Sequence, residues 1–231
     1  MATMLSEQEF RDCVRPLQGL EVSLAWKGYG SAIFLELGRL SPPQQPRRHE
    51  QGQACLRVEW DWRVENASSI LFGSSDTGPE IADGIRGLQG SRIDDIAAVG
   101  AVPEIVALLS NEQRLRSMAM TTGDPQWGIR LPSGSWISAK SGVLWMDAEP
   151  ERITGQDATE MKVSEDAGGR WGIPVAEPVN GKCAACGWFR YLDAHYELLD
   201  YGVCLAEASP FDGKVVNRSS GCPSFSASSS D

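Results

Sequence analysis

Four of the six cysteines lie in one C-terminal stretch, which constrains the fold more than any other feature of this 231-residue sequence. Cys183 and Cys186 form a C-x2-C pair, and Cys204 and Cys222 follow singly, each after 17 intervening residues. A tight turn lets both thiolates of such a pair face one metal ion, and two further thiolates complete a tetrahedral site. The segment is too short and polar to build its own hydrophobic core. The sequence therefore predicts that these four cysteines are the metal ligands.

The nature of the metal stays open at the level of sequence. Four thiolates close a zinc site and leave no free position for catalysis, so a zinc ion here would be structural. Four thiolates also hold iron–sulfur clusters, which is the alternative. Disulfides or free thiols are a third possibility, although a chain in a reducing compartment keeps its cysteines reduced. His195 lies inside the stretch and is either a replacement ligand or a surface residue.

Two resemblances attach to this region. The pattern GVC…SPFDG…VV…SGCP, over residues 202–223, is similar to a cysteine-rich tail of uncharacterised actinobacterial proteins, and it implies no known chemistry. A C-x2-C pair followed by two single cysteines resembles the cluster-binding region of high-potential iron–sulfur proteins, with longer spacings here. That second resemblance implies an iron–sulfur cluster, and it is supported by nearby aromatic residues, Trp188, Phe189, Tyr191 and Tyr201.

The N-terminal region begins with a predicted helix. Ser6 is a typical N-cap, and Glu9 three residues later completes the capping-box pattern. Gly19 suits the position just past a helix end, because glycine adopts the left-handed conformation found there. Pro16 should disturb the last turn.

A second helix with the same ending suggests an internal duplication. It is capped by Asp76 or Thr77 and ends at Gly90, so residues 17–19 and 88–90 both read Leu-Gln-Gly at a helix end. Each is followed by three runs that we expect to be antiparallel strands, over 20–26, 32–37 and 56–62 and again in the second half up to 120. In the alternative interpretation, residues 104–109 form a short helix and the likeness is chance.

The clearest predicted strand covers residues 56–65. Apolar and charged residues alternate strictly there, which is typical of a strand with one buried and one wet face. Trp60 and Trp62 fall on the same face as the aliphatic residues, so we expect both in the core rather than on a ligand-stacking surface. Further strands are expected at residues 69–72, 126–131, 135–139 and 143–146.

These elements predict an α+β chain in four parts. A duplicated domain of helix plus antiparallel β-meander covers residues 5–147, and a linker with a short helix covers 148–170. A small four-cysteine metal-binding module covers 171–225, and a disordered tail covers 226–231.

Composition narrows the classes of partner. The net charge of −10 and the pI of about 4.8 argue against a nucleic-acid surface, which needs clustered Lys and Arg. The acidity serves either solubility alone or binding to a basic partner protein. No apolar run approaches the roughly 20 residues that span a bilayer. The first residues lack the pattern of a secretory signal, so a cytoplasmic protein is expected.

The sequence gives no support for catalysis. Nucleophile-elbow, phosphate-loop and metalloprotease motifs are absent, and two histidines leave little for nucleophilic chemistry. Cys13 and Cys55 are expected to be buried or half-buried thiols. The N-terminal region is similar to uncharacterised bacterial domains of the immunity or accessory type. We therefore expect a non-catalytic binding protein with a structural zinc ion, with an iron–sulfur redox accessory protein as the alternative and an enzyme third.

Overall fold

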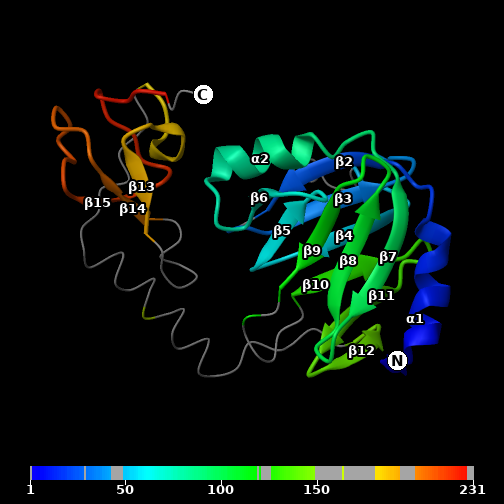
Figure 1. Ribbon diagram of the computed structural model, residues 1–231. Helices are drawn as coiled ribbons and strands as arrows, with labels where there is room; N and C mark the ends of the chain where they lie inside the picture. Colours follow the sequence, from blue (N-terminus) through cyan, green and yellow to red (C-terminus); the bar gives the residue numbers. More distant parts are fainter. Residues whose placement is uncertain are drawn as a thin grey trace. The chain divides into compact units, whose positions relative to one another are not determined.

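The computed structural model describes residues 2–28, 30–42, 49–118, 120, 126–148, 163, 180–192 and 201–227. The chain divides into two compact units, Met1–Glu151 and Arg152–Asp231. Within the described residues the fold is mostly β, with three antiparallel sheets and two short α-helices (Figure 1). The helical share is smaller than the predicted α+β class implies. The helix predicted in the linker lies outside the described residues.

The N-terminal unit contains two sheets and both α-helices. In chain order its elements are β1 (Thr3–Leu5), α1 (Glu7–Val14), the 3-10 helix η1 (Arg15–Leu17), β2 (Val22–Lys27), β3 (Ile33–Leu37), β4 (Ala54–Val58), β5 (Trp62–Glu65), β6 (Ile70–Gly73), α2 (Gly78–Arg86), β7 (Ile93–Val99), β8 (Glu104–Leu109), β9 (Arg114–Ser117), β10 (Trp127–Arg130), β11 (Trp136–Lys140) and β12 (Val143–Met146).

One hydrophobic core serves the whole N-terminal unit. The seven-stranded sheet has the order β1-β12-β11-β10-β4-β3-β2, and the five-stranded sheet has the order β6-β5-β9-β8-β7. Both sheets and both helices contribute buried side chains to this core. Phe10 of α1 meets Trp127 edge-on at 6.1 Å between ring centroids, and Trp62 meets Phe72 in the same way at 5.9 Å. Removal of this apolar surface from water is the main stabilising force.

Both predicted helix starts are confirmed. Ser6 caps α1 and forms the reciprocal capping box with Glu9, and Thr77 caps α2 in the same way with Glu80. Each box satisfies backbone N–H groups that a first helical turn leaves without partners. After α1 the chain tightens into η1 at Pro16, as the proline predicts.

Each Leu-Gln-Gly segment is hydrogen-bonded to the strand that follows the other one. Gly19 and Gly90 both adopt positive φ, at 79° and 85°, which glycine tolerates without strain. The Gly19 N–H donates to the carbonyl of Ile93 at 2.7 Å, and the Gly90 N–H donates to the carbonyl of Val22 at 3.0 Å. The end of each helical segment is thereby fixed to the start of the strand that follows the other one. The duplication itself stays a prediction.

The prediction of a single strand over residues 56–65 is wrong. The alternating run is divided between β4, in the seven-stranded sheet, and β5, in the five-stranded sheet. Between them Trp60 adopts a positive φ of 57° and is 40% exposed, whereas Trp62 is 1% exposed. The left-handed residue turns the chain from one sheet into the other. The alternation survives because both halves face the same core.

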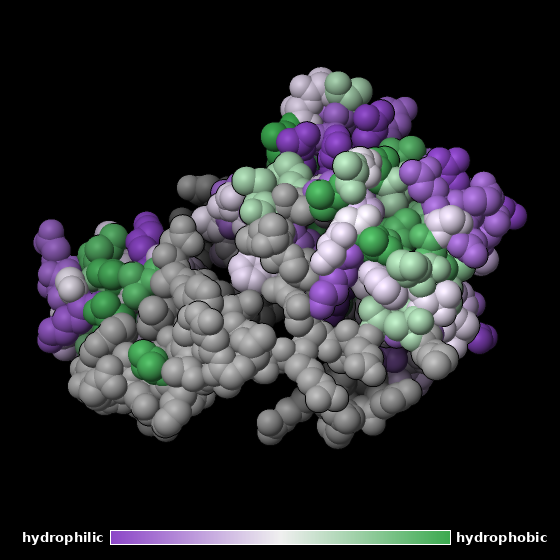
Figure 2. Space-filling view, turned by 90° about the horizontal axis from the view of Figure 1, so that it is seen from below, coloured by the Kyte–Doolittle hydropathy of each residue, from purple (hydrophilic) through white to green (hydrophobic). Residues whose placement is uncertain are grey.

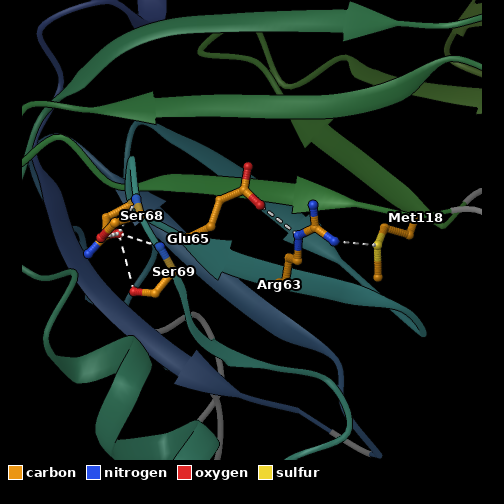
Figure 3. A network of polar contacts seen from close by, with 6 residues as sticks. Arg63, Glu65, Ser68, Ser69 and Met118 are labelled. Carbon is orange, nitrogen blue, oxygen red and sulfur yellow. Dashed lines mark hydrogen bonds and ion pairs between the residues drawn. The ribbon is translucent and has the colours of Figure 1, made fainter.

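The remaining predicted strands of this unit are confirmed within three residues. Residues 104–109 form β8, so the helical alternative is wrong. The predicted turn after β5 is closed by Asn66, whose Oδ1 accepts hydrogen bonds from the N–H groups of Ser68 and Ser69, both at 2.8 Å (Figure 3). On the half-buried face of β5, Arg63 donates to Glu65 at 2.6 Å. This pairing lies within one strand rather than across two.

Candidate metal centre

The C-terminal unit is built on a small sheet with the order β13-β14-β15. Its elements are the 3-10 helix η2 (Cys183–Ala185), β13 (Phe189–Tyr191), β14 (Tyr201–Cys204) and β15 (Val215–Asn217). Phe189 pairs in register with Cys204, and Val216 pairs with Gly202. A Cβ on Gly202 would lie 2.4 Å from the Phe189 ring, so only glycine fits there. The sheet thereby places an aromatic ring beside the third cysteine.

Backbone hydrogen bonds position the C-x2-C pair. The Cys186 N–H donates to the carbonyl of Cys183 at 2.9 Å and closes the turn between them. The Cys183 N–H donates to the carbonyl of Ser220 at 2.7 Å. Since Ser220 lies two residues before Cys222, this bond draws the fourth cysteine toward the pair.

All four predicted ligands line one pocket. Cys183, Cys204 and Cys222 are each only 6–7% exposed, and Cys186 is half-buried. The pocket has a volume of about 10 Å³, close to the minimum that one water molecule needs. The other residues of its wall are Phe189, Ala206, Gly221, Ser224 and Phe225.

The structure does not show the predicted four-cysteine metal cluster. In the part of the chain that is described, no group of three or more His, Cys, Asp or Glu side chains is arranged to hold a metal ion. All six cysteines are free thiols. Spacing along the sequence determines which thiols can reach one pocket, but it does not determine how closely their sulfur atoms approach. Convergence on a shared pocket is what the structure establishes.

The electrostatics of the pocket oppose an isolated thiolate. Burial, and then the neighbouring Cys222, Cys186 and Cys204, together raise the pKa of Cys183 to about 11. A cation between the sulfur atoms would reverse this effect, because a positive charge favours the ionised form of each ligand. Thiolates are also the soft donors that zinc and iron–sulfur clusters prefer. The donor set therefore fits a thiophilic metal.

The predicted disordered tail is wrong for its first residues. The Gly187 N–H donates to the carbonyl of Ser226 at 2.9 Å, and Ala227 forms a β-bridge with Cys186. Phe225 contributes to the pocket wall. An aromatic side chain with apolar surface to bury ties this serine-rich segment to the module. Residues 228–231 and His195 lie outside the described residues.

Sequence reasoning also missed Ser209. Its side chain is buried, at 8% exposure, and its Oγ lies 3.3 Å from Cys222 Sγ. A serine in a turn carries no metal-site signal of its own. The only indication in the sequence is its position in the SPFDG segment between the two single cysteines.

Comparison with known proteins assigns the C-terminal region to no characterised family. Residues 144–229 match the model of a family described as a protein of unknown function (DUF3027). The match agrees with the resemblance to uncharacterised proteins that the sequence suggested for this region. No curated protein and no solved structure matches the chain. None of the helices in the described part of the chain has the length and apolar character that crossing a bilayer requires.

Proposed function

We propose that the chain is a non-catalytic binding protein whose C-terminal unit is held together by a structural zinc ion. The observation that supports this most directly is the convergence of Cys183, Cys186, Cys204 and Cys222 on one buried pocket. Four thiolates satisfy zinc and leave no position for a substrate or a reactive water. Among the described residues of the unit, few side chains besides these cysteines are buried, so a bound metal would supply much of its stability.

The lining of the pocket suits a structural metal rather than a catalytic one. Among the described residues that line the pocket, none is a carboxylate, histidine or lysine. Acid–base catalysis at the metal would need such a group. The lining therefore suits a closed, structural site.

The small sheet offers a surface for a partner protein. Trp188 is 49% exposed and Leu205 is 47% exposed, and a backbone hydrogen bond of 2.9 Å joins these two residues side by side. At the left of Figure 2, the described surface of this unit shows hydrophobic side chains among hydrophilic ones. Large apolar side chains bordered by polar ones are typical of protein interfaces. The net charge of −10 makes a basic protein the complementary partner, in a cytoplasmic setting that keeps the thiols reduced.

The duplication of the N-terminal unit forms part of this proposal. Ser6, Glu9 and Gly19 have counterparts at the same spacing in Thr77, Glu80 and Gly90. The bonds from Gly19 to Ile93 and from Gly90 to Val22 are reciprocal, which is what two halves related by a local twofold axis would make. We infer that the N-terminal unit is a duplicated domain.

Elemental analysis of the purified full-length chain, with an absorption spectrum, tests the metal. We expect one zinc ion per chain and no visible absorption. Cys204→Ser should lose the zinc, and Cys13→Ser, a change in the half-buried thiol of α1, should keep it. A brown protein that contains iron would show that the site holds an iron–sulfur cluster instead of zinc. A metal-free chain would end the metal hypothesis.

A salt series in affinity capture tests the partner. We expect a basic protein to co-purify at low salt and to be released as the ionic strength rises, because screening weakens charge attraction. The double variant with Trp188→Ala and Leu205→Ala should lose it. Val102→Ala, a control at a 55% exposed apolar residue of the N-terminal unit, should not. Equal capture by all three chains would exclude this surface.

A further inference from the structure

We propose that Ser209 is a positioning residue of the metal centre. Its hydroxyl donates a hydrogen bond to the thiolate of Cys222. The inference rests on the proposed zinc site and adds to it a residue outside the four ligands. In metal sites, hydrogen bonds to the ligands orient them and tune their basicity.

The direction of this hydrogen bond follows from what else the hydroxyl does. Ser209 Oγ lies 3.3 Å from Cys222 Sγ and accepts a hydrogen bond from the Phe211 N–H at 3.0 Å. A hydroxyl has one proton to donate and two lone pairs to accept. The backbone donor occupies one lone pair, and Cys222 is the acceptor that the described structure places near the proton. A thiolate can only accept, so a metal-bound Cys222 requires Ser209 to be the donor.

The backbone fixes Ser209 in this position. Its N–H donates to the carbonyl of Ala206 at 2.8 Å, and its carbonyl accepts from the Asp212 N–H at 3.1 Å. The same turn is attached to the third cysteine, since the Gly213 N–H donates to the carbonyl of Cys204 at 2.9 Å. Ser209 therefore connects the backbone around Cys204 with the sulfur of Cys222. The two single cysteines, widely separated in sequence, are held in one frame.

Burial makes the contact matter more. Both Ser209 and Cys222 are less than a tenth exposed, so water does not compete for the sulfur. Hydrogen bonds to an ionised acceptor are stronger than those between neutral groups, and low local dielectric strengthens them. The hydroxyl should therefore stabilise the form of Cys222 that binds metal.

The test compares zinc affinity in two serine variants of the full-length chain by competition with a chromophoric chelator. Ser209→Ala should bind zinc about 10- to 100-fold more weakly, the range typical of lost contacts of this kind. Ser224→Ala is the matched control, because Ser224 lines the same pocket but its hydroxyl donates to the carbonyl of Ala208 at 2.8 Å. That variant should bind as the wild type does. Ser209→Thr keeps the hydroxyl and should restore most of the affinity.

Spectroscopy separates positioning from a general loss of structure. With Co²⁺ in place of zinc, the sulfur-to-metal charge-transfer bands should shift in Ser209→Ala and match the wild type in Ser224→Ala. In wild-type protein loaded with cadmium-113, the Ser209 hydroxyl proton should couple to the metal through the Cys222 sulfur. This last measurement needs no variant to fold.

The outcomes distinguish the two proposals. Wild-type protein that binds neither zinc nor Co²⁺ overturns the metal site and this inference with it. Wild-type protein that binds zinc, with Ser209→Ala equal to Ser224→Ala in affinity and spectrum, overturns the role of Ser209 alone. Absence of the hydroxyl coupling in the cadmium-loaded chain also counts against that role.

Discussion

At the scale of single residues, the buried carboxylate of Glu36 affects the ionisation of a neighbouring cysteine in the N-terminal unit. Glu36 is 5% exposed and accepts hydrogen bonds from Arg130 at 3.0 Å and from the Gly52 N–H at 2.8 Å. Cys55 is 3% exposed and pairs in register with Glu36. Burial, and then the charge of Glu36, raise the pKa of Cys55 far above its ordinary value of 9.0.

This shift predicts a loss of stability in alkali. Above pH 9 the unfolded chain releases the Cys55 proton while the folded chain keeps it, so the folded state binds more protons. Stability then falls as pH rises, by about 1.4 kcal/mol for each pH unit from this thiol. Urea unfolding at pH 8 and pH 10 measures the effect, with Cys55→Ala as the reference for all other titrating groups. Identical pH dependence in both chains would contradict the assignment.

The buried ion pair between Arg130 and Glu36 gives a prediction about stability at neutral pH. Arg130→Leu leaves Glu36 buried without its cation, and we expect a cost of about 3–5 kcal/mol. Arg86→Leu breaks the exposed ion pair with Asp83 in α2, and such pairs contribute less than about 1 kcal/mol. Chemical denaturation of both variants checks the contrast. A small loss for Arg130→Leu would mean that the Gly52 backbone alone satisfies Glu36.

Part of the candidate site could be predicted residue by residue. Cysteine spacing identifies the four thiols that share the pocket, because few other residue types have so specific a use. Ser209 and Phe225 could not be found in this way, since serine and phenylalanine occur in turns and tails for many reasons. Their roles depend on contacts that only the folded chain creates.

At the scale of elements, the packing of α2 on β6 depends on the absence of a side chain. A Cβ on Gly84 would lie 2.6–2.8 Å from three ring atoms of Phe72. Phe72 also packs edge-on against the buried Trp62, which limits its freedom to move away. Helix propensity and packing therefore act in opposite directions at this glycine.

We predict that the steric clash with Phe72 outweighs the gain in helix propensity. Gly84→Ala should destabilise the N-terminal unit by about 1–3 kcal/mol, the usual cost of overpacking, despite a propensity gain of up to about 1 kcal/mol. Gly78→Ala, at the open start of the same helix, meets only Lys27 Cε at 3.9 Å, so it should cost less than Gly84→Ala. Thermal unfolding of the two variants gives the comparison. Equal midpoints would show that the Phe72 ring moves aside freely.

Element boundaries were predictable where the local chemistry is specific. The caps at Ser6 and Thr77 act within a few residues, so sequence alone reveals both helix starts. The predicted end of the second helix at Gly90 is wrong, because α2 already ends at Arg86. The break at Trp60 could not be predicted, because a bulky residue at positive φ is uncommon and has no sequence signature. The surrounding sheets, rather than local preference, impose that conformation.

At the scale of the whole molecule, the two units should respond separately to metal removal. The zinc ion that we propose for the C-terminal unit should stabilise that unit alone, since a ligand stabilises only the fold that binds it. A strong chelator should abolish the Co²⁺–thiolate bands of the substituted protein. The unfolding transition reported by near-ultraviolet dichroism of the buried Trp62 and Trp127 should not move. A lower midpoint for that transition after metal removal would show that the units unfold together.

The pairing of distant strands is the part of the fold that sequence patterns could not predict. Alternation and turn residues indicate where strands lie, but β4 pairs with β10, and β5 pairs with β9, across long stretches of chain. The free energy of such pairings depends on the complete core rather than on local sequence. Local patterns predict two consecutive meanders. In the structure, strands from the two halves of the unit pair with each other in both sheets.

That pairing has a consequence for a chain emerging from the ribosome. Strands β2 to β4 can assemble early, but the open edge of β4 waits for β10, and β5 waits for β9. An unpaired edge of this kind invites association with other chains, and distant pairing slows folding. Nascent chains shorter than residue 127 should therefore be aggregation-prone and rely on chaperones. The seven-stranded sheet is complete only once β12, from Val143 to Met146, is available to join β11 to β1.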